Sequence, residues 1–167
     1  VKETLETEGI SDVLFTEILI ATGHNADDNA ETIFHRIVRG TSLAGLSGMK
    51  YLDYDREFDL NLVKPILNLS RSEIEEFCSE NGLKYRLDHT NLENDYSRNI
   101  IRNEILPLID ERLGVNSSGA LVRLANIAME QRDALSELTQ GIDKSDRKAI
   151  QGLPKALRHK LYLDLIE

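Results

Sequence analysis

Residues 18–39 read ILIATGHNADDNAETIFHRIVR, and this stretch decides the fold class of the chain. Its apolar start does not alternate with polar residues, which predicts a strand over residues 17–22 that is covered on both faces of a parallel sheet. Asn25 is a typical helix N-cap and Gly40 a typical stop, so we predict a helix over residues 26–39. Its apolar side chains recur at helical spacing: Ala30, Ile33, Phe34, Ile37 and Val38. A strand leading directly into a helix indicates an α/β fold.

Further elements of the same kind follow this unit. Residues 40–50 hold three glycines and are predicted to form a loop with one helical turn at most. A second strand is expected near residues 58–63, closed by Pro65. Ser70 and Glu73 have the spacing of a capping box, and they open a further helix.

That helix is expected to end at Gly82, and residues 83–87 resemble a short strand. Residues 88–95 are rich in Asp and Asn, which favours turns. A helix is predicted from Arg98 to Leu106, because Pro107 should end it.

Beyond residue 112 the pattern becomes entirely helical. Residues 114–119 have the composition of a linker, and apolar side chains at helical spacing predict one long helix over residues 118–140. A polar break at 141–146 precedes another helical stretch over 153–167, with Pro154 near its first turn. We therefore expect an α/β part in residues 1–112, opening on a short helix within 1–11, and a helical part in residues 113–167.

Composition and charge exclude several classes of protein. The chain has 167 residues, 41% of them hydrophobic, and no run of about 20 apolar residues that a membrane-spanning helix needs. The first 20 residues lack the pattern of a signal peptide. A single cysteine, Cys78, excludes an internal disulfide and a zinc site of several cysteines, and it favours a reducing, cytoplasmic location. The net charge of −9 means that any RNA binding would depend on local basic clusters.

Four titratable side chains follow the first predicted strand: His24, Asp27, Asp28 and Glu31. Ligands of α/β proteins bind outside the carboxyl ends of parallel strands, and helical spacing puts Glu31 on a face with an aspartate. Such a group could hold Mg²⁺ through its carboxylates, bind an ammonium group, or use His24 as a base. The alternative is that the aspartates only cap the helix. Gly23 and Thr32 add nothing to capping, so a functional site is favoured for the whole group.

A second candidate group lies on the helix predicted after residue 97. Arg98 and Arg102 are one turn apart, and two planar guanidinium groups at this spacing suit phosphate binding. Arg36, Arg39 and Lys64 could join them. The alternative is a solvated face paired with Glu104 or Asp95. Cys78 lies among apolar neighbours in a capped helix, as expected of a structural thiol.

Three ordered stretches resemble one known family: ATGHNADDNAETIFHRIVRGTSLAGLSGM at 21–49, VKPILNLSRSEIEEFCSENGLKYRLDHTN at 63–91 and SRNIIRNEILPLI at 97–109. Together they resemble the tRNA(Ile)-lysidine synthetases of the N-type ATP pyrophosphatase group. The resemblance implies the C-terminal half of a Rossmann-like parallel-sheet domain, of the adenine nucleotide alpha hydrolase type, in residues 1–112. Residues 113–167 would be a helical linker and the start of a helical substrate-binding domain.

The family's activity is implied in the same way. Such enzymes use ATP to adenylate carbon 2 of the wobble cytidine in an isoleucine tRNA, and the amine of free lysine then displaces AMP. By position, His24, Asp27 and Asp28 would lie at the adenylation centre, with the two aspartates holding Mg²⁺. Glu31, with Asp28, would attract the lysine ammonium, and Arg98 and Arg102 would stabilise charge on the reacting phosphates. A homodimer is compatible with the resemblance.

One motif of the family is absent from this sequence. The nucleotide-binding loop of the form SGGxDS occurs nowhere in it, so no nucleotide-binding residues are assigned and the chain is expected to be inactive alone, as part of a longer enzyme. Two alternatives remain open at this point. One is a tRNA thiolase of the same group, which the single cysteine supports poorly. The other is a non-catalytic interaction module in which the acidic residues only cap a helix.

Overall fold

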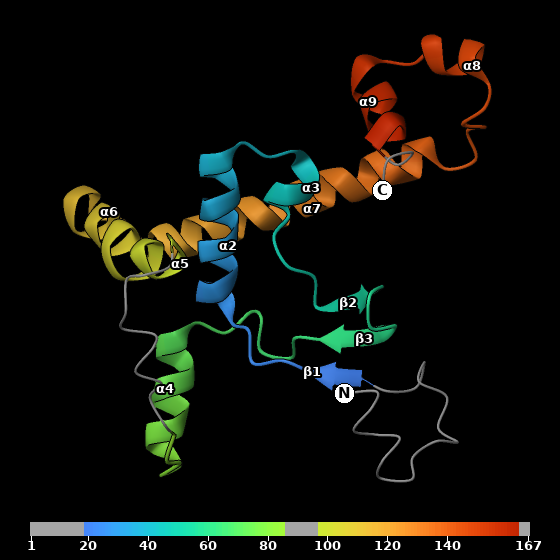
Figure 1. The fold of residues 1–167 in the computed structure, drawn as a ribbon. Coiled ribbons are helices and arrows are strands. Elements are labelled where there is room, and N and C mark those ends of the chain that lie inside the picture. The colour runs from blue at the N-terminus through green and yellow to red at the C-terminus, as the bar shows by residue number, and fades with distance from the viewer. Residues whose placement is uncertain (1–18, 86–96, 164–167) are drawn as a thin grey trace, which may run out of the picture.

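The computed structural model describes residues 19–85 and 97–163. These residues form a small sheet and a larger set of helices (Figure 1). Strand β1 (Leu19–Ala21) pairs in parallel with β3 (Leu60–Val63), and β2 (Leu52–Asp55) pairs with the other edge of β3 in the antiparallel direction. The parallel pair, together with the helices, confirms the α/β class.

The sheet differs from the sequence prediction in two respects. Strand β2 was not predicted, because its sequence LDYD is rich in aspartate, which strands disfavour. It forms because Asp55 accepts the backbone N–H groups of Glu57 and Phe58 and so closes a tight turn into β3. The prediction that β1 is covered on both faces is wrong for the described residues. Leu19 remains 60% exposed, because the helices that follow run away from the sheet.

Helix α2 (Ala26–Arg39) has the predicted bounds, with Asn25 as its N-cap and Gly40 as its C-cap. The loop after it holds one helical turn, α3 (Leu43–Leu46), as expected. Helix α4 (Arg71–Glu80) begins with the predicted capping box, and after its C-cap Asn81 the predicted stop, Gly82, has the left-handed conformation. Residues 83–85 form no strand, so that part of the prediction is wrong. Three stretches with predictions lie outside the described residues. They are the short helix within 1–11, the end of the strand and the turns in 86–95, and the end of the last helix in 164–167.

The helical stretch after residue 96 continues through the proline that was expected to end it. It consists of α5 (Ser97–Ile100), a π-helical turn (Ile101–Ile105) and α6 (Leu106–Leu113). The wider π turn changes the hydrogen-bond register, so that α6 begins afresh and Pro107 falls in its first turn. A proline is tolerated there because the N–H it lacks would have no helical partner.

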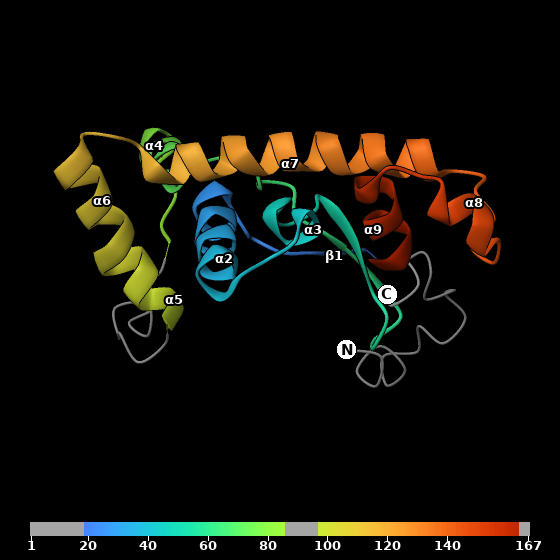
Figure 2. The ribbon, with the colours of Figure 1, turned by 90° about the horizontal axis from the view of Figure 1, so that it is seen from above.

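Helix α7 (Ser117–Thr139) is the spine of the molecule, close to the predicted 118–140. Figure 2 shows α2, α3 and α9 (Lys155–Leu163) on one side of α7, with α6 at one end and α8 (Arg147–Gln151) at the other. Contacts of α7 with α2, α3 and α9 hold this arrangement together. The core follows it: Ala30 and Ile33 of α2 and Ala125 and Ala128 of α7 are nearly fully buried. Among the described residues, no helix has both the length and the apolar character to cross a membrane.

Candidate functional site

The site begins at the turn between β1 and α2, where the chain leaves the sheet. Asn25 is buried in this turn, and its side chain accepts the N–H of Asp28 at 3.0 Å. Asp28 returns the bond through Oδ2, which accepts the N–H of Asn25 at 3.0 Å. This reciprocal capping box fixes the first turn of α2 and with it the direction of the side chains that follow.

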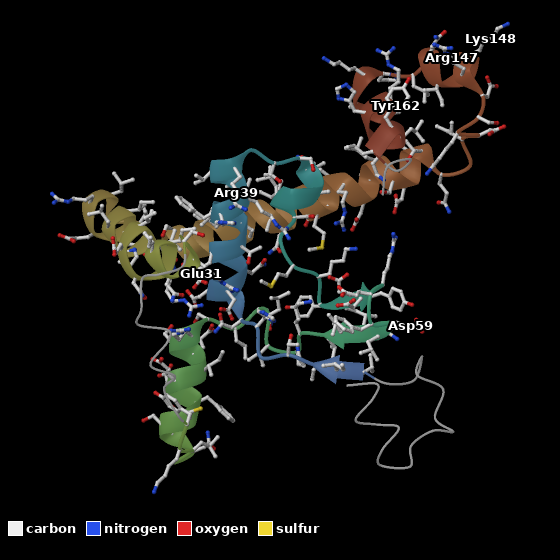
Figure 3. All side chains as sticks on the ribbon, in the orientation of Figure 1. Glu31, Arg39, Asp59, Arg147, Lys148 and Tyr162 are labelled. Carbon is white, nitrogen blue, oxygen red and sulfur yellow. The ribbon has the colours of Figure 1, made fainter. Side chains whose placement is uncertain are left out.

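Glu31 lies one turn further along α2 and is only 1% exposed. A buried carboxylate requires hydrogen-bonded or charged partners, and here two guanidinium groups supply them. Arg98 donates from Nε to Oε2 at 2.8 Å, and Arg102 donates from Nε to Oε1 at 2.5 Å and from Nη2 to Oε2 at 2.9 Å. Figure 3 shows Glu31 on the part of α2 that lies nearest to α5.

Asp28 completes this group, which we call the Glu31 cluster: Asp28, Glu31, Arg98 and Arg102. Its Oδ1 accepts from Nη2 of Arg98 at 3.1 Å and from Nη2 of Arg102 at 2.7 Å. Two carboxylates face two guanidinium groups, so the cluster is balanced in charge. An added ammonium group or phosphate would therefore compete with these ion pairs for the carboxylates or the guanidinium groups.

The two arginines differ in how firmly they are held. The side chain of Arg102 is 16% exposed, whereas that of Arg98 is 40% exposed. Burial by itself would lower the pKa of Arg102, but its hydrogen bond to Glu31 and the charges of Glu31 and Asp28 outweigh burial and hold that pKa above its ordinary value. Arg102 is therefore a permanent cation in the cluster, and Arg98 is the member with access to solvent.

Asp27 faces away from the cluster, toward helix α4. Its Oδ2 accepts the backbone N–H of Arg71 at 2.7 Å and so contributes to the start of α4. Each aspartate therefore stabilises the start of a helix, as the capping interpretation predicts. Asp28 caps its own helix α2, and Asp27 binds the N-terminus of α4. Asp27 still borders a cavity of about 670 Å³ together with Glu31 and Arg102.

His24 lies beside the cluster without a hydrogen bond to it. Its Nδ1 is 2.9 Å from Oγ1 of Thr22. A second cavity, of about 420 Å³, has His24, Asp28, Arg98 and Arg102 on its walls. The structure therefore brings Asp28, Glu31, Arg98 and Arg102 into direct contact, gives His24 a shared cavity with three of them, and turns Asp27 to the other side.

The three further cations that could have joined this group do not reach it. Arg36 donates from Nη1 to the carbonyls of Gly45 and Gly48, at 3.0 and 3.2 Å, and so holds the α3 loop. Arg39 lies at the far end of α2 from Glu31 (Figure 3). Lys64 lines a different cavity, shared with Arg36.

Sequence reasoning missed Asn29, which positions the loop beside the site. Asn29 is 6% exposed, and its Oδ1 accepts the N–H of Met49 at 2.8 Å. Gly48 makes this approach feasible, since its φ is +69° and a Cβ at this position would lie 2.4 Å from that same oxygen. The glycines of the loop were a signal for such a close approach, but nothing in the sequence identified Asn29 as the partner.

A metal site does not form from the described side chains alone. Within residues 19–85 and 97–163, no three His, Cys, Asp or Glu side chains converge in a way that could hold a metal ion. Cys78 is half-buried on α4, which extends away from α2 and α5 in Figure 1. The cluster therefore offers hydrogen-bonding and ionic chemistry, with an imidazole nearby for proton transfer.

Comparisons with known proteins agree on the region that holds the site. The model of the PP-loop domain matches residues 8–109. A tRNA(Ile)-lysidine synthase of Clostridioides difficile is 43% identical over 118 residues, which cover 71% of this chain and 24% of that protein. Proteins of the same name from Symbiobacterium thermophilum and Francisella tularensis subsp. novicida are 42% and 36% identical, over 72% and 74% of this chain and 24% and 30% of their own lengths. The chain thus spans about a quarter of the first two of these relatives.

Proposed function

The chain belongs to the PP-loop family, and we propose that it forms part of an enzyme that uses ATP to attach lysine to the wobble cytidine of an isoleucine tRNA. The observation that carries this proposal is the buried Glu31 cluster, which lies inside the matched residues 8–109. The similarity to proteins named tRNA(Ile)-lysidine synthase supports the choice of tRNA and lysine. The α/β fold with its parallel strand pair agrees with a family that uses ATP.

The proposed reaction has two steps that balance separately. The oxygen on carbon 2 of the cytidine attacks the α-phosphorus of ATP, a new O–P bond forms, and pyrophosphate leaves. The neutral ε-amine of lysine then attacks carbon 2, the C–O bond to AMP breaks, and the amine loses a proton. The first step places negative charge on phosphate oxygens, and the second requires an amine that has lost the proton of its ammonium form.

Arg98 would supply the positive charge for the first step. It is the more exposed guanidinium of the cluster and borders the cavity of about 420 Å³, so it can turn toward a phosphate without unfolding the helix. Arg102, with its denser contacts to Glu31 and Asp28, would stay in place and hold the carboxylates. In this proposal Arg98 binds the phosphate, and the less exposed Arg102 keeps Glu31 and Asp28 in position.

Glu31, with Asp28, would bind the lysine ammonium once Arg98 has moved. The cluster is charge-balanced in the structure, so a second cation becomes favourable when one guanidinium leaves its carboxylate. This order of events links lysine binding to the arrival of the nucleotide phosphate. His24, on the wall of the same cavity, is placed to accept the proton from the amine, a role that histidine side chains commonly take in general acid–base catalysis.

Mg²⁺ commonly binds the phosphate oxygens of ATP, so we propose a carboxylate of this chain as an additional ligand. Oδ1 of Asp27 has no hydrogen-bond partner among the described residues, so Asp27 is the carboxylate we propose for that ion, with Asp28 second because its oxygens are engaged. Phosphate oxygens and water would have to complete the coordination, as they commonly do for Mg²⁺. The charge stabilisation and the proton transfer assigned to Arg98 and His24 do not depend on this ligand.

The division of the chain remains a proposal as well. We propose that residues 1–112 belong to the ATP-using catalytic domain and that residues 113–167 begin a helical region that helps to bind the tRNA. The family match ends at residue 109, and Gly114 ends α6 in the left-handed conformation.

We also place the reaction in the cytoplasm, where ATP and tRNA occur, and predict a homodimer, which sedimentation equilibrium can check.

The test uses the full-length gene product and separates the two steps. Exchange of labelled pyrophosphate into ATP, dependent on tRNA, reports adenylation, and incorporation of labelled lysine into tRNA reports the complete reaction. An isoleucine tRNA transcript with a wobble cytidine should support both, and the same transcript with a wobble uridine should support neither. Lysine incorporation that does not depend on the wobble base would overturn the proposed function.

Substitutions in the cluster then test the roles. Glu31→Gln keeps the shape of the side chain and should raise the KM for lysine about tenfold or more while pyrophosphate exchange persists, since a charge-assisted hydrogen bond is lost. Arg98→Lys should instead slow pyrophosphate exchange, because a point charge replaces the planar donor fork. If Glu31→Gln slows exchange and leaves the KM for lysine unchanged, the assignment of Glu31 to lysine is wrong.

A further inference from the structure

A separate cavity of about 620 Å³ lies where the sheet and α3 approach helices α7 and α9. We call it the Lys64 pocket. It shares only His24 with the cavity beside the Glu31 cluster, so the two lie on either side of that residue. Five cationic side chains and two carboxylates border it: Arg36, Lys50, Lys64, Arg132, Lys160, Asp53 and Asp133. This excess of positive charge stands out in a chain whose net charge is −9.

Lys64 is the unusual member of this group. The residue as a whole is only 7% exposed, and its ammonium forms no hydrogen bond or ion pair with any of the described residues. The ammonium nitrogen nevertheless reaches the space of the pocket, because no side-chain nitrogen or oxygen of the described residues is both buried and without a partner. A lysine in this setting covers its aliphatic stem with protein and keeps its charged end in water. The structure therefore holds a cation in a pocket and provides no anion for it from the described side chains.

The backbone keeps Lys64 in this position. It directly follows β3, its N–H donates to the carbonyl of Tyr51 at 2.9 Å, and its carbonyl accepts the N–H of Leu67 at 3.2 Å. Pro65 comes next and restricts the chain further. The buried position of the side chain thus results from a fixed strand end.

The two carboxylates at the pocket do not neutralise Lys64. Asp133 is paired with Arg132 at 3.1 Å, and Asp53 accepts the backbone N–H of Tyr54 at 3.1 Å. Arg132 is held in turn by Nη1, which donates to the buried Ser47 at 3.0 Å. Arg132 is therefore held in a fixed position at the pocket, which lowers the entropy lost when an anion binds to it.

We propose that the Lys64 pocket binds a phosphate group, with the ammonium of Lys64 as its central contact. Arg36 is the second contact, because only its Nη1 is used by the α3 loop and its Nε and Nη2 have no partner among the described residues. A phosphate offers several acceptor oxygens and a charge opposite to that of the ammonium. The phosphate can come from a polyphosphate or from the backbone of an RNA strand. This inference stands apart from the proposed function, because it rests on the charges of the pocket alone.

The experiment measures binding of two probes to the full-length gene product by calorimetry: inorganic pyrophosphate and a short single-stranded oligouridylate. Lys64→Met removes the charge and keeps the length of the side chain. It should weaken one or both probes about tenfold or more. The same variant should melt at about the same temperature as the wild type when no probe is present, since the ammonium that it removes is reached by solvent. Lys148→Met, on the exposed part of α8, is the matched control and should change neither quantity.

Each outcome either supports or contradicts phosphate binding at the Lys64 pocket. Loss of pyrophosphate binding alone identifies a polyphosphate site, loss of RNA binding alone identifies a backbone site, and loss of both identifies a site for either. Lys64→Arg, which keeps the charge, should retain binding. Acylation of Lys64 in the wild type, followed by mass spectrometry, should be suppressed by the probe that binds, and this readout needs no variant. The proposal fails if Lys64→Met binds both probes as the wild type does, if Lys148→Met weakens them equally, or if no probe protects Lys64.

Discussion

At the scale of single residues, Glu31 shows how a charge can be placed in the interior of a helical contact. It is as buried as the apolar side chains around it, and it is stable there because Arg98 and Arg102 satisfy both of its oxygens. A buried ion pair of this kind adds little net stability when complete, because desolvation offsets the attraction. Removing one partner of the pair lowers the stability of the fold, since the charge of the other partner then stays buried without compensation.

The unequal exposure of the two arginines leads to a prediction. Arg102→Met should destabilise the fold by about 3 kcal/mol, because it takes three hydrogen bonds from Glu31 and Asp28 in a poorly hydrated place. Arg98→Met should destabilise it by only about 1 kcal/mol, because water can replace the half-exposed guanidinium. Hydrogen exchange of α2 amides measures both effects. Equal losses for the two variants would contradict the division into a supporting and a movable arginine.

At the scale of elements, the helices whose ends are set by local capping residues were predicted correctly, and the elements that depend on long-range contacts were not. Helices α2 and α4 carry caps within their own sequence, and their bounds followed from Asn25 and Ser70. Strand β2 and the passage through Pro107 depended on pairing with β3 and on a π turn, which no local pattern announced.

The candidate site divides in the same way. The sequence placed Asp28 and Glu31 together because they share a helix, and Arg98 with Arg102 for the same reason. Their meeting joins residues about 70 positions apart, and only tertiary packing brings it about. The contact of Asp27 with Arg71 and the burial of Lys64 were missed for that reason as well.

The cap of α4 gives a prediction about pH. The hydrogen bonds from the side chain and backbone of Ser70 lower the pKa of Glu73 below its ordinary value of 4.5. The ionised form is thus favoured in the folded state, so its stabilisation is complete above about pH 4.5 and is lost as pH falls through the lowered pKa. Exchange protection of α4 should therefore exceed that of Glu73→Gln at pH 7, and the difference should shrink near pH 3. Glu75→Gln, outside the capping box, is the control, and a gap for Glu73→Gln that persists at pH 3 would contradict the account.

At the scale of the whole molecule, α7 joins parts that the sequence suggested were separate. It packs on α2 and α3 through a face that includes Ala125 and Ala128, and it carries Arg132 to the wall of the Lys64 pocket. The small side chains allow the helices to approach closely, and the position of α7 sets the width of that pocket. Stability and phosphate binding should therefore respond together to a change at this contact.

Ala128→Leu tests this coupling. Three additional carbon atoms at a position that is 2% exposed should force α7 away from its neighbours and destabilise the fold by about 1 to 3 kcal/mol. The displacement should also weaken binding of pyrophosphate or oligouridylate, whichever the Lys64 pocket takes, although Ala128 does not border the pocket. Ala134→Leu, on the exposed side of the same helix, should change stability by less than about 0.5 kcal/mol and leave binding intact. Because the binding assay can be run well below the melting temperature of each variant, weaker binding there reports displacement of α7 rather than unfolding. Unchanged binding by a destabilised Ala128→Leu would show that the pocket is formed without α7.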